Sequence, residues 1–201
     1  GRRRSGNFAV EILGKRLLSC AVAFADSWRR SKAGLAEDQE AADADVQAAR
    51  RNLEAETGDD REMQSRVATA VGVVGAWLKG VAPSLQSEIS ALDRAISDLG
   101  LNRETGELTE VDPVADSRYA ALAALIERLL RKEGSWRNDE RLVVFTEYKT
   151  TLDYLVRRLT SRFGEEQVLT LFGGMDDVER GDVKRWFNDP LHPVRVLVAT
   201  D

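Results

Sequence analysis

Polar side chains and glycines follow three strand-like runs in the C-terminal part of the chain. Thr146 ends the apolar run 142–146, and Tyr148 and Lys149 follow it. Gly173 and Gly174 follow the run 168–172, while Thr200 ends the run 194–200 and Asp201 follows it. Hydroxyl groups, an ammonium group and backbone N–H groups beside glycine can hold a phosphate oxygen without reading a base sequence. Each set alone is weak evidence, because two glycines after a strand most often form a tight turn. Taken together, the three sets mark the strand ends as a candidate ligand site.

The elements around these residues predict a parallel sheet. Amphipathic helical patterns separate the three runs, one over about 152–163 and the other over about 178–187, with Asp176 as the N-cap of the second. This order implies right-handed crossovers, which bring the carboxyl ends of the strands to one edge, where ligands bind in such sheets. A further helix precedes the first run, with Asp116 as its N-cap and Gly134 as its stop.

The N-terminal part of the chain shows helical periodicity. Apolar residues from Phe8 to Trp28 recur at steps of three to five and predict one amphipathic helix over about 7–31. Further helices are expected over about 63–79 and 85–99, the last closed by Gly100. Residues 34–61 are rich in Ala, Asp, Glu and Gln with few large apolar residues, so they could extend a helix or form a mobile connector but could not make a core. We expect the flexible acidic stretch of the chain there.

The fold class follows from these patterns and from the length. The chain has 201 residues, which gives room for one domain and a helical appendage but not for two complete α/β lobes. We expect an α-helical region over 1–115, followed over 116–201 by a partial α/β lobe with a parallel βαβαβ sheet. The chain lacks an initiator Met and stops at a strand-like run, so we expect it to be part of a longer protein.

Composition excludes several classes of chemistry. A single cysteine, Cys20, and a single histidine, His192, rule out an internal disulfide, a thiolate zinc cage and a histidine metal cluster. Cys20 is expected to be a small buried apolar side chain and His192 a loop residue. The longest apolar run, 67–78, is too short to span a membrane, so we expect a cytoplasmic protein.

Charge is distributed unevenly along the chain. The net charge is −5, but residues 1–32 hold eight basic and two acidic side chains, and residues 33–62 hold three basic and ten acidic ones. The basic block could bind phosphates, or it could be a solvated helix face paired with the acidic stretch. Charge alone does not separate the two interpretations. The adjacent carboxylates Asp59-Asp60, Glu165-Glu166 and Asp176-Asp177 are expected to be solvated surface.

In order along the chain, these residues resemble the second RecA-like lobe of a superfamily 2 helicase, particularly the bacterial Swi/Snf-type, RapA-like ATPases. Residues 141–148 are similar to motif IV, residues 173–180 to the glycine, capped helix and arginine that follow it, and residues 196–201 to the first half of motif V. Residues 8–24 resemble the helical region between the two lobes of such proteins. Residues 35–110 have no counterpart in the resemblance.

The resemblance implies ATP-driven translocation along nucleic acid, with duplex DNA as the expected partner. It implies that Asp201 couples nucleic-acid binding to the ATP cleft between the lobes. The residues that it implies contact nucleic acid are Thr146, Tyr148, Lys149, Gly173, Gly174 and Thr200. ATP and Mg²⁺ would be bound by the full-length parent, together with the missing first lobe. The sequence contains no Gly-x-x-x-x-Gly-Lys-Ser/Thr loop. We therefore expect no catalytic residue or metal ligand in this chain, and no ATP hydrolysis by it alone.

The sequence is also compatible with a different class of protein. The alternative is a non-enzymatic helical scaffold, which binds protein partners through residues 1–115 and carries a degenerate α/β half-domain. The parent gene separates the two hypotheses. A helicase requires a phosphate-binding loop encoded upstream of Gly1 and a Gly-x-x-x-Arg motif downstream of Asp201.

Overall fold

The structure is a computed structural model that describes residues 2–103 and 106–200. These residues form two compact units. The first comprises Gly1–Thr57 and Arg61–Val114, and the second comprises Gly58–Asp60 and Ala115–Asp201. The short segment Gly58–Asp60 therefore belongs with the C-terminal unit, although it lies far from that unit in the sequence. Asp201, the residue expected to couple to an ATP cleft, lies outside the described residues.

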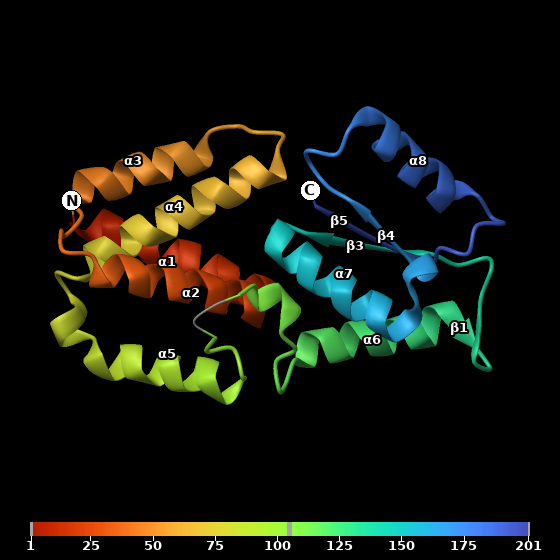
Figure 1. The fold of residues 1–201 in the computed structure, drawn as a ribbon, viewed down its shortest axis with the longest axis horizontal. Coiled ribbons are helices and arrows are strands. Elements are labelled where there is room, and N and C mark those ends of the chain that lie inside the picture. Colours follow the sequence, from red (N-terminus) through yellow and green to blue (C-terminus); the bar gives the residue numbers. More distant parts are fainter. Residues whose placement is uncertain (1, 104–105, 201) are drawn as a thin grey trace. The chain divides into compact units, whose positions relative to one another are not determined.

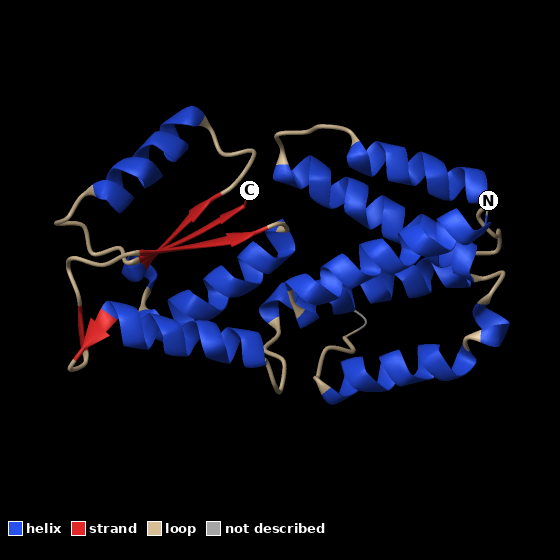
Figure 2. Ribbon diagram, turned by 180° about the vertical axis from the view of Figure 1, so that it is seen from behind, coloured by secondary structure: helices blue, strands red, loops and turns tan. Residues whose placement is uncertain are grey.

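The first unit is helical (Figures 1 and 2). Its helices are α1 (Arg2–Ser19), α2 (Ala21–Ala36), α3 (Asp43–Glu54), α4 (Asp60–Leu78) and α5 (Gln86–Asp98), with 3₁₀ turns at Ala82–Ser84 and Leu108–Glu110. The helices expected near 63–79 and 85–99 are confirmed. Gly100 follows α5 with φ of +72°, a left-handed conformation that suits the glycine predicted to close this helix.

The single helix expected over 7–31 is wrong, because the chain breaks at Cys20. Cys20 has φ −161° and ψ 161°, an extended conformation that ends α1 and begins α2. Its Sγ accepts a hydrogen bond from the N–H of Ala23 at 3.3 Å, so it acts as the N-cap of α2. Cys20 is also buried, as expected.

The acidic stretch 34–61 contains the helix α3. Val46 of this helix is fully buried, and Asp43 Oδ1 accepts hydrogen bonds from Ser5 Oγ at 2.7 Å and from Trp77 Nε1 at 3.0 Å. The middle of the stretch therefore packs into the first unit, and the expectation that it could not contribute to a core is wrong at Val46. Flexibility of the remaining residues of the stretch stays a prediction.

Helices α2 and α4 cross at very short range. A Cβ atom on Gly75 would lie 2.0 Å from the carbonyl oxygen of Ser31, and one on Gly34 would lie 2.1 Å from that of Gly72. Real atoms do not approach so closely, so the crossing requires glycine at both positions.

The second unit carries a three-stranded parallel sheet, as the sequence predicts. After α6 (Ser117–Leu130) come β3 (Leu142–Thr146), α7 (Lys149–Phe163), β4 (Val168–Leu171), α8 (Asp177–Asn188) and β5 (Val196–Thr200), in the spatial order β3-β5-β4. A 3₁₀ turn, Glu165–Gln167, precedes β4. Helices α6 and α7 lie on one face of the sheet and α8 on the other (Figure 1). This is the expected partial α/β lobe.

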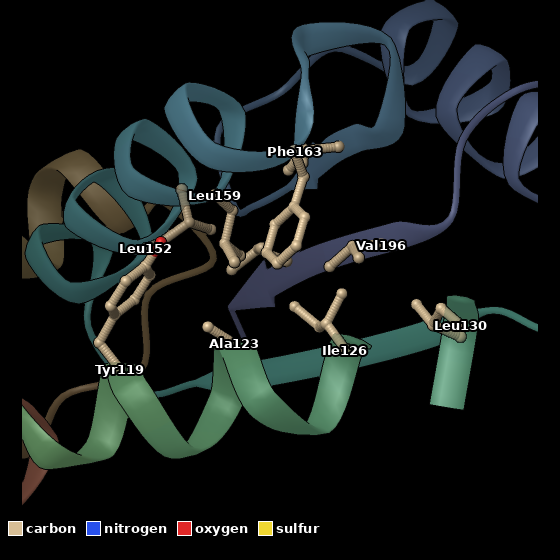
Figure 3. Packing of buried hydrophobic residues seen from close by; sticks show 10 residues of the cluster. Tyr119, Ala123, Ile126, Leu130, Leu152, Leu159, Phe163 and Val196 are labelled. Atoms are coloured by element: carbon tan, nitrogen blue, oxygen red, sulfur yellow. The ribbon is translucent and has the colours of Figure 1, made fainter. Parts of the chain in front are cut away.

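The core of the second unit lies between the sheet and the pair α6 and α7. Figure 3 shows side chains of both helices directed toward β5. The buried cluster contains Tyr119, Ala123, Ile126 and Leu130 from α6, Leu152, Leu159 and Phe163 from α7, Val168 from β4, and Val196 and Val198 from β5. Complete burial of one such aliphatic or aromatic side chain stabilises a fold by about 1.5–3 kcal/mol.

Both predicted caps in this unit are present. Asp116 Oδ1 accepts the N–H of Tyr119 at 2.9 Å at the start of α6, and Asp176 Oδ1 accepts the N–H of Glu179 at 2.8 Å at the start of α8. A short aspartate side chain at this position satisfies an amide that has no partner within the helix.

Helix α6 ends earlier than expected. A two-residue hairpin, β1 (Arg131–Lys132) with β2 (Ser135–Trp136), follows Leu130 directly. Glu133 and Gly134 form its turn with φ of 52° and 82°. Two positive φ values are typical of the tight hairpin turn that matches the twist of the strands. Gly134 therefore closes a hairpin and not a helix.

Candidate nucleic-acid interface

Two of the predicted phosphate contacts converge on one oxygen atom. The backbone N–H of Gly173, which follows β4, donates to Asp60 Oδ2 at 2.5 Å. The hydroxyl of Thr200, at the end of β5, donates to the same oxygen at 2.6 Å. All three residues belong to the second unit. The carboxyl ends of two adjacent parallel strands thus form a pair of donors directed at a single anionic oxygen.

The two glycines allow the chain to approach this point closely. A Cβ atom on Gly173 would lie 2.5 Å from the carbonyl oxygen of Gly58, and one on Gly174 would lie 3.0 Å from Asp59 Oδ1. The N–H of Asp60 also donates to the carbonyl of Gly173 at 3.4 Å. Gly174 has φ of +92°, which a residue with a side chain adopts only under strain. The segment Gly58–Asp60 therefore lies directly against the glycine pair.

Thr146 lies beside this pair of donors. It ends β3 and is the register partner of Thr200 in the neighbouring strand β5. Paired residues of parallel strands project to the same face of the sheet, so both threonines belong to the face that α6 and α7 cover. Thr146 is half-buried. The structure places Thr146 beside Thr200, while Gly173 and Thr200 share Asp60 Oδ2 as their acceptor.

Lys149 is already engaged at the start of α7. Its Nζ donates to Asp153 Oδ1 at 2.7 Å and lies 4.6 Å from the centroid of the Phe172 ring. This places the ammonium near the end of β4, immediately before Gly173. An added phosphate would compete with Asp153 for the ammonium. A nucleic-acid contact by Lys149 stays a prediction.

Tyr148 has a structural place at the N-cap of α7. Its side chain is buried, and its carbonyl accepts the N–H groups of Thr151 at 2.9 Å and Leu152 at 3.0 Å. A role of Tyr148 in supporting bound nucleic acid also stays a prediction.

A buried polar group holds α7 against the N-terminus of α6. Tyr154 is fully buried, donates to Asp116 Oδ2 at 2.5 Å, and accepts from Arg158 Nη1 at 2.7 Å. Burial, and then the hydrogen bond to Asp116, raise the pKa of Tyr154 well above its ordinary range. The neutral phenol therefore fixes the helix whose first turn carries Lys149.

Asp60 is the site residue that the sequence did not reveal. The expectation that Asp59-Asp60 is solvated surface is wrong for Asp60, which is half-buried and accepts from Gly173 and Thr200. These partners lie 113 and 140 residues away in the chain. The local signal, two acids before a helix, predicts only a favourable helix start.

The end of the basic block pairs with acids of the first unit. Arg29 Nη2 and Arg30 Nε contact the two carboxylate oxygens of Asp26 at 3.0 Å each, and Lys32 Nζ contacts Asp93 Oδ2 at 2.9 Å. These pairs favour the interpretation of a charged helix face for the three side chains. Their partners, Asp26 and Asp93, lie outside the acidic stretch 34–61, so the expected pairing with that stretch is wrong for these three side chains.

Metal ligands do not gather within the part of the chain that the structure describes. No group of three or more His, Cys, Asp and Glu side chains there could hold a metal ion. Among the same residues, no helix is both long and apolar enough to cross a membrane.

Comparisons with known proteins do not identify a relative. No protein-family model matches the chain, and no match is found among curated proteins or among solved structures. Functional assignment therefore depends on the geometry of the strand ends.

Proposed function

We propose that the second unit binds the phosphate backbone of nucleic acid at the carboxyl ends of β4 and β5. One observation carries this proposal, namely that the N–H of Gly173 and the hydroxyl of Thr200 converge on a single anionic oxygen. Carboxylate and phosphate oxygens are both charged acceptors that form short, strong hydrogen bonds with such donors. Contacts of this kind hold a backbone in register without reading its sequence.

Within this proposal, the chain is part of the second RecA-like lobe of an ATP-dependent helicase or translocase of the Swi/Snf type. Support comes from the βαβαβ order, the capped helix α8 after the glycine pair, and the polar strand ends. ATP and Mg²⁺ belong to the full-length parent, with its first lobe. The expected nucleic acid is duplex DNA, and the expected location is the cytoplasm.

Substitution of Thr200 tests the proposal. Binding of a fluorescently labelled DNA duplex is measured by anisotropy for the wild type, Thr200→Val and Thr200→Ser. Thr200→Val keeps the shape but loses the donor, so we expect affinity to fall about tenfold, the value of one hydrogen bond to a charged group. Thr200→Ser keeps the hydroxyl and should stay near the wild type. Equal affinity of all three proteins would contradict the proposal.

A second candidate is the helical scaffold, which the surface of α1 favours. Val10, Leu17 and Leu18 are exposed on this helix, and the spacing of seven residues places Val10 and Leu17 on the same face. An exposed apolar stripe of this kind is typical of a protein-binding helix. Under the scaffold hypothesis, Thr200→Val leaves DNA affinity unchanged, and the parent gene encodes neither the upstream phosphate-binding loop nor the downstream Gly-x-x-x-Arg motif.

A further inference from the structure

Asp60 occupies the position that the proposed function gives to a phosphate. Its Oδ2 accepts both donors at the strand ends, at 2.5 Å from Gly173 N and 2.6 Å from Thr200 Oγ1. The carbonyl oxygen of Gly58 would lie 2.5 Å from a Cβ atom on Gly173, so backbone as well as carboxylate fills the space in front of the glycine. A phosphate oxygen could not reach the same two donors while this segment is in place.

We propose that the segment Gly58–Asp60 is an internal competitor of nucleic acid, with the Asp60 carboxylate as a substitute for a phosphodiester oxygen. This inference rests on the proposed function and adds a regulatory element to it. Nucleic acid binds only when the segment is displaced, so the apparent affinity is reduced by the fraction of molecules in which Asp60 is withdrawn.

Chemical similarity makes the competition direct. A carboxylate and a phosphodiester each carry one negative charge and present oxygen acceptors to N–H and O–H donors. Both cannot share these donors, since two anions at hydrogen-bond distance from the same groups repel each other. The competition is therefore between one covalently attached anion and one external anion of the same class.

The chain around Asp60 permits such a displacement. Helix α3 ends at Glu54 and α4 begins at Asp60, so residues 55–59 form a connection without helix or strand. The contacts of Asp60 with the strand ends are three hydrogen bonds, two accepted by its carboxylate and one donated by its N–H at 3.4 Å. Release of Asp60 breaks these bonds. The connection before it is itself held by hydrogen bonds from Arg66 Nη1 to the carbonyl of Ala55 and from Thr57 Oγ1 to Glu62 Oε2, at 2.8 Å each.

Substitution of Asp60 tests the competition. Anisotropy measurements with the same DNA duplex compare the wild type with Asp60→Asn and Asp60→Ala, and we expect both variants to bind about tenfold more tightly. Asp60→Asn keeps the size of the side chain, so it tests the charge even where Asp60→Ala is poorly folded. Circular dichroism confirms that each variant is folded.

A matched control separates competition from net charge. Glu56→Gln removes one negative charge from the same connection, at an exposed position, and should leave the affinity close to that of the wild type. An equal gain in DNA affinity for Glu56→Gln and Asp60→Asn would overturn the inference, because it would show that any loss of negative charge strengthens binding.

A double variant distinguishes failure of this inference from failure of the proposed function. In Asp60→Ala, adding Thr200→Val should remove most of the gain, because the freed donor is then absent. If Thr200→Val weakens binding but both Asp60 variants bind as the wild type does, the strand ends bind DNA and the competition is wrong. If Thr200→Val has no effect in either background, the proposed function fails and the competition fails with it.

Discussion

The hydroxyl of Thr200 lies 2.6 Å from Oδ2 of Asp60, although 140 residues separate the two in the chain. This hydrogen bond joins the end of β5 to the segment Gly58–Asp60 of the same unit. The hydroxyl group predicted to contact a phosphate therefore donates to a carboxylate of the protein itself.

Gly173 should not tolerate a side chain. In Gly173→Ala, the new Cβ would lie 2.5 Å from the carbonyl oxygen of Gly58, so the segment must move. We expect the variant to lose about 1–3 kcal/mol of unfolding free energy, the usual cost of overpacking. Urea unfolding measures this loss. Gly181→Ala is the control, because nothing lies within 4 Å of its Cβ and alanine favours a helix by about 0.5–1 kcal/mol.

Two glycines of α4 should respond in opposite directions. Gly75→Ala places a Cβ 2.0 Å from the carbonyl oxygen of Ser31 and should destabilise the first unit by at least about 1–3 kcal/mol. Gly72→Ala meets nothing within 4 Å and should stabilise it by up to about 1 kcal/mol. Thermal unfolding of the two variants measures both effects. Similar unfolding temperatures for Gly75→Ala and Gly72→Ala would contradict the close crossing of α2 and α4.

Tyr154 should make stability depend on pH in the alkaline range. Its pKa is raised in the folded protein, whereas an unfolded tyrosine loses its proton near pH 10. The stabilisation is therefore complete below about pH 10 and falls as the pH rises further, by up to about 1.4 kcal/mol per pH unit. Urea unfolding of the wild type and Tyr154→Phe should show a difference that is largest at neutral pH and narrows above pH 10. A constant difference would contradict a neutral, buried phenol.

Substitution of the arginines at the start of α1 tests whether the basic block binds phosphates. Arg3 and Arg4 are exposed. If the basic block meets phosphates, replacing Arg2, Arg3 and Arg4 with Ala weakens DNA binding and flattens its dependence on salt, because fewer counterions are released. Thr200→Val should lower the affinity without changing the salt dependence, since contact with a hydroxyl group releases no counterion. Unchanged binding of the triple variant across a salt titration would exclude a role for these arginines.

Most of the second unit could be predicted because its signals are local. The strands and helices follow from apolar periodicity, and the caps Asp116 and Asp176 lie three residues from the amides that they bind. The break at Cys20 was missed because an apolar residue adopts an extended conformation in the middle of a helical pattern. Two-residue strands, as in the hairpin after Leu130, leave no periodicity to detect.

The candidate site was only half predictable, for a different physical reason. Thr146, Gly173 and Thr200 could be grouped because parallel strands bring their carboxyl ends to one edge. Asp60 belongs to a segment between two helices, and nothing in its local sequence states which distant surface it contacts. Its pairing with Gly173 depends on packing over more than a hundred residues.

Nuclear magnetic resonance of the backbone amides tests the central claim most directly. In ¹H–¹⁵N spectra of the full chain carrying Asp60→Asn, titration with a short DNA duplex should shift the amide signals of Gly173 and Thr200. These shifts should saturate at the dissociation constant given by anisotropy, because the N–H of Gly173 donates to the bound phosphate. Saturable DNA binding that leaves both signals in place would contradict a phosphate site at the ends of β4 and β5.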